Sequence, residues 1–153
     1  MGIEDIAFGV VKSWWGSKKN RERTIKLIIK ELEYNKKLIE DTHKLAEVYI
    51  STNVRPAIIF FPFQTKICDM VINSGLIFLL DMEEENIDLF VDLNNRFIQI
   101  NELIKSSNNQ ITIAATPIEP DNRHGTMLAM LIRNELTGMA VKIDNILKKL
   151  VRL

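Results

Sequence analysis

One uninterrupted helical pattern sets the main constraint on this fold. Between Gly16 and Pro56 the sequence contains neither glycine nor proline, the two residues least compatible with a helix interior. The pattern predicts a single helix over residues 18–53, about 54 Å long at 1.5 Å per residue. Its apolar side chains recur at the spacing of one helix face: Ile25, Ile28, Leu32, Ile39, Ala46 and Tyr49.

Two polar residues interrupt this apolar face. Asn35 and Thr42 fall on the same side of the helix as Ile28, Leu32 and Ile39. A polar residue in an apolar seam costs stability but fixes the register of packing. We therefore predict that Asn35 faces the core and contacts another helix.

Two further asparagines repeat this arrangement later in the chain. Asn94 and Asn101 fall on one apolar face with Phe90 and Phe97. Two arrangements are open: Asn35, Asn94 and Asn101 meet as one buried network, or each finds a separate backbone or water partner. In both arrangements we assign the asparagines a structural role ahead of a functional one.

The remaining segments show shorter helical patterns with recognisable ends. Gly75 suits a helix C-terminus, and Asp81 followed by Glu84 resembles a capping box. Thr116 and Pro117 suit the approach to another helix. We expect helices over residues 3–15, 64–74, 82–105 and 121–150, with a polar loop and a β-prone patch over 106–116.

These elements predict an all-α protein: an antiparallel helical bundle of four core helices plus a short amphipathic N-terminal helix. Residues 1–17 make up the N-terminal helix and residues 18–153 the bundle. The length of 153 residues suits one domain with a sizeable core. Pro56 and Pro62 bracket the apolar run AIIFF, which we interpret as a crossing between helices.

Composition narrows the classes of function. A net charge of zero argues against nucleic acid as a partner. The single cysteine, Cys68, allows no intrachain disulfide and favours a reducing cytoplasm, and its apolar neighbours predict a small buried side chain. The chain lacks a phosphate-binding glycine loop, Gly-x-Ser-x-Gly and Cys-x-x-Cys, so we expect no catalytic residue and no cofactor.

The charge is nevertheless uneven along the chain. Residues 12–30 carry a net charge of +6, and residues 81–92 carry −6. The basic stretch follows two tryptophans and an amphipathic segment, a combination typical of contact with an anionic membrane or a partner protein. The alternative is that residues 3–15 pack on the bundle. The candidate contact residues are Trp14, Trp15, Lys18, Lys19, Arg21 and Arg23.

The two tryptophans are expected to differ in environment. Adjacent residues on a helix point about 100° apart, so one face cannot bury both fully. Trp14 continues the apolar face of residues 3–15 and should be the more buried.

Both histidines have a metal-like spacing. Glu40 precedes His43 by three residues, and Asp121 precedes His124 by three, which places each pair on one helix face. Dimetal bundles combine two such pairs with a glutamate from each of two other helices. The alternative is that Asp121 caps a helix and Glu40 belongs to a solvated charge pattern, and we expect no metal.

Three segments carry a resemblance: KELEYNKKLIE (30–40), CDMVINSGLIFLL (68–80) and NNRFIQINELI (94–104). Together they resemble a loose group of uncharacterised prokaryotic helical-bundle proteins with an N-terminal hydrophobic or membrane-attached segment. This chain has Cys68 where that group has an aromatic residue. The resemblance implies attachment to a membrane at the N-terminus and implies no activity.

Three interpretations of function follow. The first is a non-catalytic, membrane-peripheral or protein-interaction module, cytoplasmic and associated with an anionic membrane surface. The second is a structural homo-oligomer, such as a homodimer, with the apolar run AIIFFPF (57–63) as its contact patch. The third is a metal-binding bundle that uses the two carboxylate–histidine pairs.

Overall fold

The computed structural model describes Ser13 and residues 16–51, 60–114 and 122–153. All regular elements in these ranges are helical, so the all-α prediction is confirmed for this part of the chain. The expected helix over residues 3–15 and both tryptophans lie outside the described residues. The elements are α2 (Lys18–Ser51), α3 (Lys66–Asn73), the 3-10 helix η1 (Leu76–Leu79), α4 (Glu84–Ala114), α5 (Asn122–Leu136) and α6 (Met139–Leu150).

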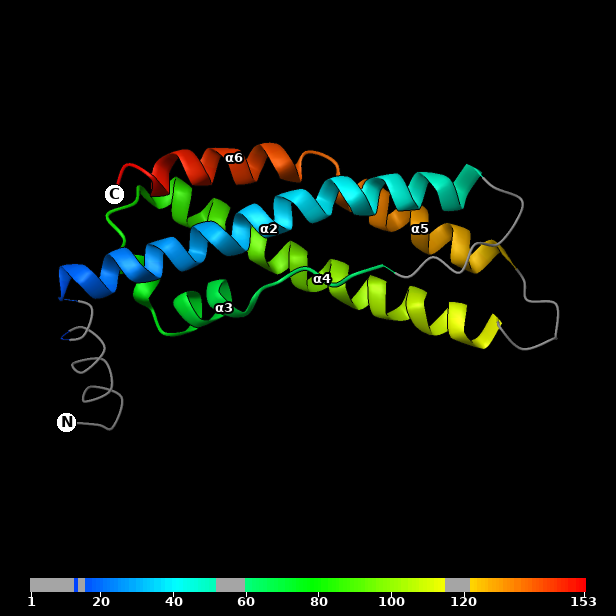
Figure 1. The fold of residues 1–153 in the computed structure, drawn as a ribbon, viewed down its shortest axis with the longest axis horizontal. Coiled ribbons are helices and arrows are strands. Elements are labelled where there is room, and N and C mark those ends of the chain that lie inside the picture. Colours follow the sequence, from blue (N-terminus) through cyan, green and yellow to red (C-terminus); the bar gives the residue numbers. More distant parts are fainter. Residues whose placement is uncertain (1–12, 14–15, 52–59, 115–121) are drawn as a thin grey trace.

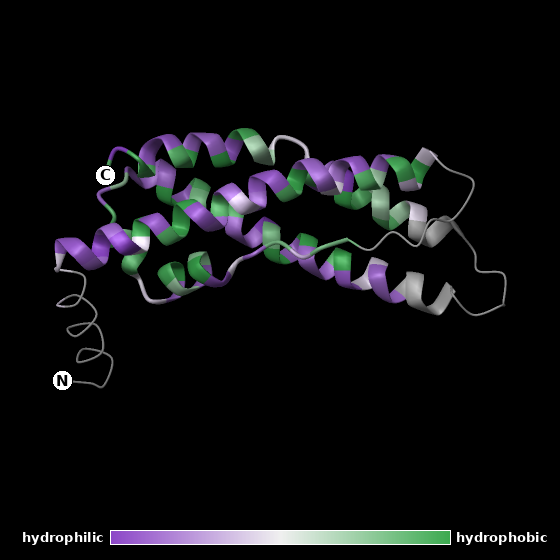
Figure 2. Cartoon of the chain, viewed as in Figure 1, coloured by the Kyte–Doolittle hydropathy of each residue, from purple (hydrophilic) through white to green (hydrophobic). Residues whose placement is uncertain are grey.

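Helix α2 is continuous over Lys18–Ser51, as its sequence pattern predicts. Asn35 is fully buried on its inner face, which confirms the predicted orientation of this side chain. Polar and apolar residues alternate along each described helix (Figure 2), as amphipathic helices around a shared core require. The predicted face of α2 is buried at Ile25, Ile28, Leu32, Ile39 and Ala46, and partly buried at Tyr49.

The two long helices run in the same direction, and α5 and α6 return antiparallel to both (Figure 1). Helices α5 and α6 each pack against both α2 and α4. Between α2 and α4 themselves there is almost no direct contact. The extended segment that precedes α3 runs back along α4 (Figure 1). The chain therefore crosses back along the molecule before α4 begins.

Helix α4 extends to Ala114, so the predicted polar loop over residues 106–116 is wrong as far as residue 114. Ser107 is buried and continues the inward face of Phe97, Ile100 and Ile104 at three- and four-residue spacing. Helix α5 packs along α4. Tertiary packing of this kind overrides the weak helix propensity of a Ser- and Asn-rich stretch.

The predicted last helix is broken at Gly138. Helix α5 ends at Leu136 and α6 begins at Met139. Gly138 has φ of 79°, a left-handed conformation that glycine adopts without the steric cost of a Cβ atom. The return path is therefore two shorter helices joined by a tight turn.

We expect Gly138→Ala to lower the free energy of unfolding by about 1 kcal/mol, the cost of a left-handed conformation for a residue with a Cβ atom. A Cβ atom at this position would meet nothing within 4 Å, so no steric clash adds to that cost. Urea unfolding measures the change. Asn134→Ala, an exposed position of α5, is the control and should change stability by less than about 0.5 kcal/mol. An unchanged or increased stability of Gly138→Ala would show that the turn can adopt another conformation.

Candidate interaction sites

An extended segment, residues 60–65, which we call the strap, runs between α2 and α4 (Figure 1). Phe60 and Phe63 are buried, whereas Phe61 and Pro62 are exposed. The two buried phenylalanines are three residues apart. Pro62 favours the extended conformation of the strap because it fixes its own φ and restricts Phe61 to extended backbone.

Three asparagine side chains hold the strap by its main chain. An amide offers one oxygen acceptor and one NH₂ donor, so it can satisfy the C=O and the N–H of a single residue together. Asn108 accepts the N–H of Phe60 at 3.0 Å and donates to its C=O at 2.9 Å. Asn101 does the same for Phe63 at 2.7 and 2.9 Å.

The third asparagine reaches the strap from the opposite helix. Asn35 of α2 accepts the N–H of Gln64 at 2.8 Å and donates to its C=O at 2.6 Å. The strap is thus bound to α4 through Asn101 and Asn108 and to α2 through Asn35. These three contacts replace the direct packing that α2 and α4 lack.

Asn94 continues the row on α4 but has a different partner. It lies seven residues before Asn101 and donates to the carboxylate of Asp69, on α3, at 2.6 Å. Asn35, Asn94 and Asn101 therefore have separate partners and do not bind one another in a single network. Asn35 and Asn101 bind main-chain atoms, as the second arrangement predicts, whereas Asn94 binds a side chain, which neither arrangement predicted. Asn108 was not identified from the sequence, because it falls within the loop predicted over residues 106–116.

Glu31 is a second buried polar residue that the sequence did not single out. Its carboxylate accepts the N–H of Ile67 and of Cys68, both at 2.9 Å. Glu31 thus caps the N-terminus of α3 from α2, where the helix dipole favours a negative charge. Its position on the inner face of α2, four residues before Asn35, was the available signal.

Cys68 is buried, as its neighbours in the sequence predict. Burial, and then the neighbouring Glu31 carboxylate, raises the pKa of the Cys68 thiol far above its ordinary value. The thiolate is the reactive form of cysteine, so burial and the raised pKa both disfavour reaction of this side chain in the folded protein.

We expect Asn101→Ala to destabilise the protein by roughly 2–4 kcal/mol, because it leaves the N–H and C=O of the buried Phe63 without partners. Asn95→Ala, an exposed position on the same helix, is the matched control and should change stability by less than about 0.5 kcal/mol. Chemical denaturation of both variants provides the comparison. Equal effects would mean that the amide contacts do not hold the strap.

Asn101→Asp tests the side-chain NH₂ donor of Asn101 separately from its oxygen acceptor. A carboxylate cannot donate to the C=O of Phe63, but a protonated carboxyl group can. The folded protein should therefore raise the pKa of this carboxyl above its unfolded value of about 3.9. The stability of Asn101→Asp relative to the native chain should then be highest at acidic pH and decline as pH rises through the raised pKa. A loss of stability in Asn101→Asp, relative to the native chain, that does not vary with pH would contradict this role of the donor.

A basic surface lies at the end of the molecule where α2 begins. The first turns of α2, η1 and the C-terminal end of α6 lie together at this end (Figure 1). Lys18, Lys19 and Arg23 are exposed. Arg21, the fourth predicted contact cation, donates to the Asp81 carboxylate at 2.9 Å and so ties the segment after η1 to α2. We call Lys18, Lys19 and Arg23 the basic cluster.

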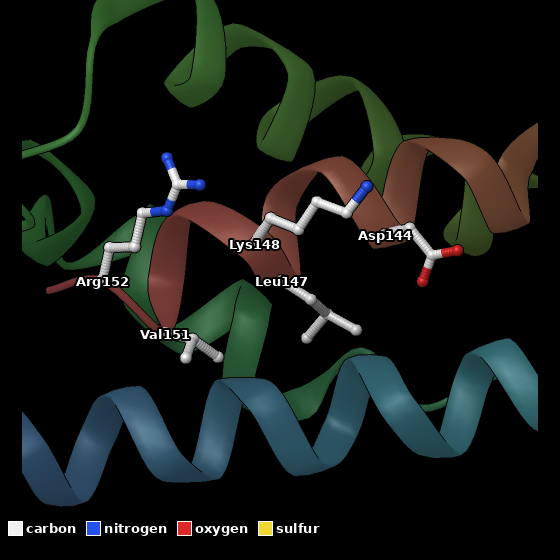
Figure 3. Close-up of a pocket in the computed structure, with 5 residues that line it drawn as sticks. All are labelled: Asp144, Leu147, Lys148, Val151 and Arg152. Atoms are coloured by element: carbon white, nitrogen blue, oxygen red, sulfur yellow. The ribbon is translucent and has the colours of Figure 1, made fainter.

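A shallow pocket of about 380 Å³ lies beside the C-terminal end of α6. Figure 3 shows the side chains of Leu147 and Val151 pointing toward α2, whereas the Arg152 side chain points away from it. The pocket adds a cationic rim and an apolar floor to the same end of the molecule. Its lining residues are Asp144, Leu147, Lys148, Val151 and Arg152.

The residues predicted as metal ligands are only partly described. Glu40 is exposed on α2 and His43 is half-buried. Asp121 lies outside the described residues, and His124 belongs to α5 without a described side chain. Among the residues that the structure describes, no group of three His, Cys, Asp or Glu side chains could hold a metal ion.

Asp92 on α4 and Glu135 on α5 are carboxylates with cationic partners. Asp92 is bound by Lys142 at 3.0 Å and Arg96 at 3.1 Å, and these cations, Lys142 first, lower the pKa of its carboxyl. Glu135 lies 3.7 Å from Arg96. This group of charges joins α4 to α5 and α6 close to the turn at Gly138.

Comparisons with known proteins give no relative. No protein-family model matches the chain, and no significant match was found among curated proteins or solved structures. The resemblance to prokaryotic helical bundles therefore stays a prediction. Within the described ranges, every helix is too short or too polar to cross a bilayer.

Proposed function

We propose that this protein is a non-catalytic helical module that docks on an anionic membrane surface through the basic end of α2. The observation that carries the proposal is the basic cluster, three exposed cations at one end of the molecule. The sequence directly before it has the amphipathic pattern and the two tryptophans of an interfacial segment. The cytoplasmic face of a membrane, with its anionic lipids, is the surface that fits.

Electrostatic attraction and apolar contact would act together in this arrangement. Each basic residue near an anionic surface increases binding by roughly five-fold, and the effect declines with salt. Apolar side chains add a contribution that salt does not screen. Binding through both contributions is stable where either alone is weak and reversible.

Replacing Lys18, Lys19 and Arg23 together by Gln should weaken binding to vesicles of phosphatidylserine and phosphatidylcholine by roughly 100-fold. Vesicle flotation at low salt measures the partition. The matched control replaces three exposed lysines elsewhere, Lys37, Lys44 and Lys105, by Gln. Their loss should change binding by less than about three-fold, since they lie away from the proposed contact. The membrane proposal fails if the native chain does not float with anionic vesicles at any lipid concentration.

A second candidate function is contact with another copy of this chain. One turn of α5 exposes Met127, Met130 and Leu131, which share a helix face and have the composition of a protein contact. The strap is a weaker candidate than the sequence suggested, because Phe60 and Phe63 are buried in the chain's own core.

If α5 forms a homodimer contact, Met130→Lys should increase the dimer dissociation constant at least ten-fold, because it places a charge in an apolar interface. Light scattering coupled to size-exclusion chromatography over a range of concentrations measures it. Val141→Lys, an exposed apolar position on α6, serves as the control. A native chain that is monomeric at every concentration would exclude this function.

A further inference from the structure

The 3-10 helix η1 exposes one aromatic side chain at the basic end of the molecule. Phe78 is 73% exposed, the largest exposed fraction of any aromatic residue in the part of the chain that is described. Its neighbours Leu76, Ile77 and Leu80 are all buried. A 3-10 helix has three residues per turn, so burying these neighbours directs the intervening Phe78 outward.

Several contacts fix the backbone of η1 around Phe78. Gly75, with φ of 72°, starts the turn and accepts the N–H of Phe78 at 3.2 Å. The N–H of Leu80 is bound by Ile77 at 3.2 Å. Helix α3 packs against η1 on one side, and the Arg21–Asp81 ion pair of 2.9 Å holds the other side to α2. Phe78 therefore cannot turn inward without disrupting these contacts.

Phe78 lies at the same end of the molecule as the basic cluster (Figure 1). The Arg21–Asp81 ion pair ties the segment that follows Phe78 to the first turns of α2, the same part of the helix that carries the basic cluster. An exposed aromatic ring and exposed cations at one end of a molecule suit a bilayer interface, with the ring at headgroup level and the cations on the phosphates.

Acidic residues at the start of α4 reduce the net positive charge at this end of the molecule. Asp81 is paired with Arg21, and Glu83 lies 3.5 Å from Lys149, but Glu84 and Glu85 are exposed near the same end. These two carboxylates oppose attraction to an anionic surface. An exposed aromatic side chain at this end would add an attraction that does not depend on charge.

We propose that Phe78 inserts into the headgroup region of an anionic phospholipid bilayer as a second contact at the same end of the molecule as the basic cluster. The inference rests on the proposed membrane function and adds to it a rigid insertion residue outside the N-terminal segment. It predicts that the end of the molecule that carries η1 faces the bilayer.

A matched pair of labelled variants tests the insertion. Phe78→Cys and Phe61→Cys, each labelled with an environment-sensitive thiol dye, place the probe at two exposed phenylalanine positions, the second on the strap and 60% exposed. Cys68 is buried and the pKa of its thiol is raised, so the native chain should take up no dye. With vesicles of phosphatidylserine and phosphatidylcholine, emission should rise at least two-fold at position 78 and stay unchanged at position 61.

A second pair of variants measures the contribution to binding without a dye. Phe78→Ser should weaken partition into the same vesicles about ten-fold, as expected for the loss of one buried aromatic contact. Phe61→Ser should leave the partition within two-fold. Both positions are exposed, so the folded state should persist in both variants, and circular dichroism verifies this.

The outcomes separate this inference from the proposed function. Suppose that the native chain binds vesicles. The insertion is wrong if the emission of the dye at position 78 does not change, or if Phe78→Ser and Phe61→Ser bind vesicles equally well, and the membrane function then stands. If the native chain does not bind vesicles, the membrane function itself is wrong. Emission that rises at position 78 with protein concentration alone, without vesicles, would assign Phe78 to a contact between copies and overturn the insertion.

Discussion

A main-chain segment without secondary structure of its own must find partners for its N–H and C=O groups, and three side-chain amides provide them here. Asn35, Asn101 and Asn108 each satisfy both groups of one strap residue. Buried polar groups without partners are costly, so the strap could not lie between two helices otherwise. Through these amides the strap links α2 to α4, and α5 and α6 pack against both long helices.

Local periodicity was sufficient to predict α2 and the orientation of Asn35. The pattern has no interruption, so the helix and its buried face could be assigned residue by residue. The strap could not be predicted in this way, because its two inward residues, Phe60 and Phe63, follow a spacing of three within a short apolar run. The end of α4 was misjudged because Ser107 and Asn108 become helical only through packing with distant parts of the chain.

Only the positive charge of the candidate interaction surface could be predicted from the sequence. The sequence identified Lys18, Lys19, Arg21 and Arg23 as a cluster, but it did not indicate that Arg21 is committed to Asp81. It also did not indicate which residue of the run LIFLL points outward, since every residue in that run is apolar. The exposure of Phe78 depends on how η1 packs against α3 and α2, which is a tertiary property.

The way in which the strap is held has a consequence for its sequence. The asparagines contact only main-chain atoms, so they place no demand on the identity of the side chains they hold. Phe60 and Phe63 must fill the core, and Pro62 stiffens the backbone, but the side chains of Phe61 and Gln64 extend into solvent. These two positions therefore tolerate wide sequence drift and offer attachment points for a label or a grafted recognition motif, held at a defined place between two long helices.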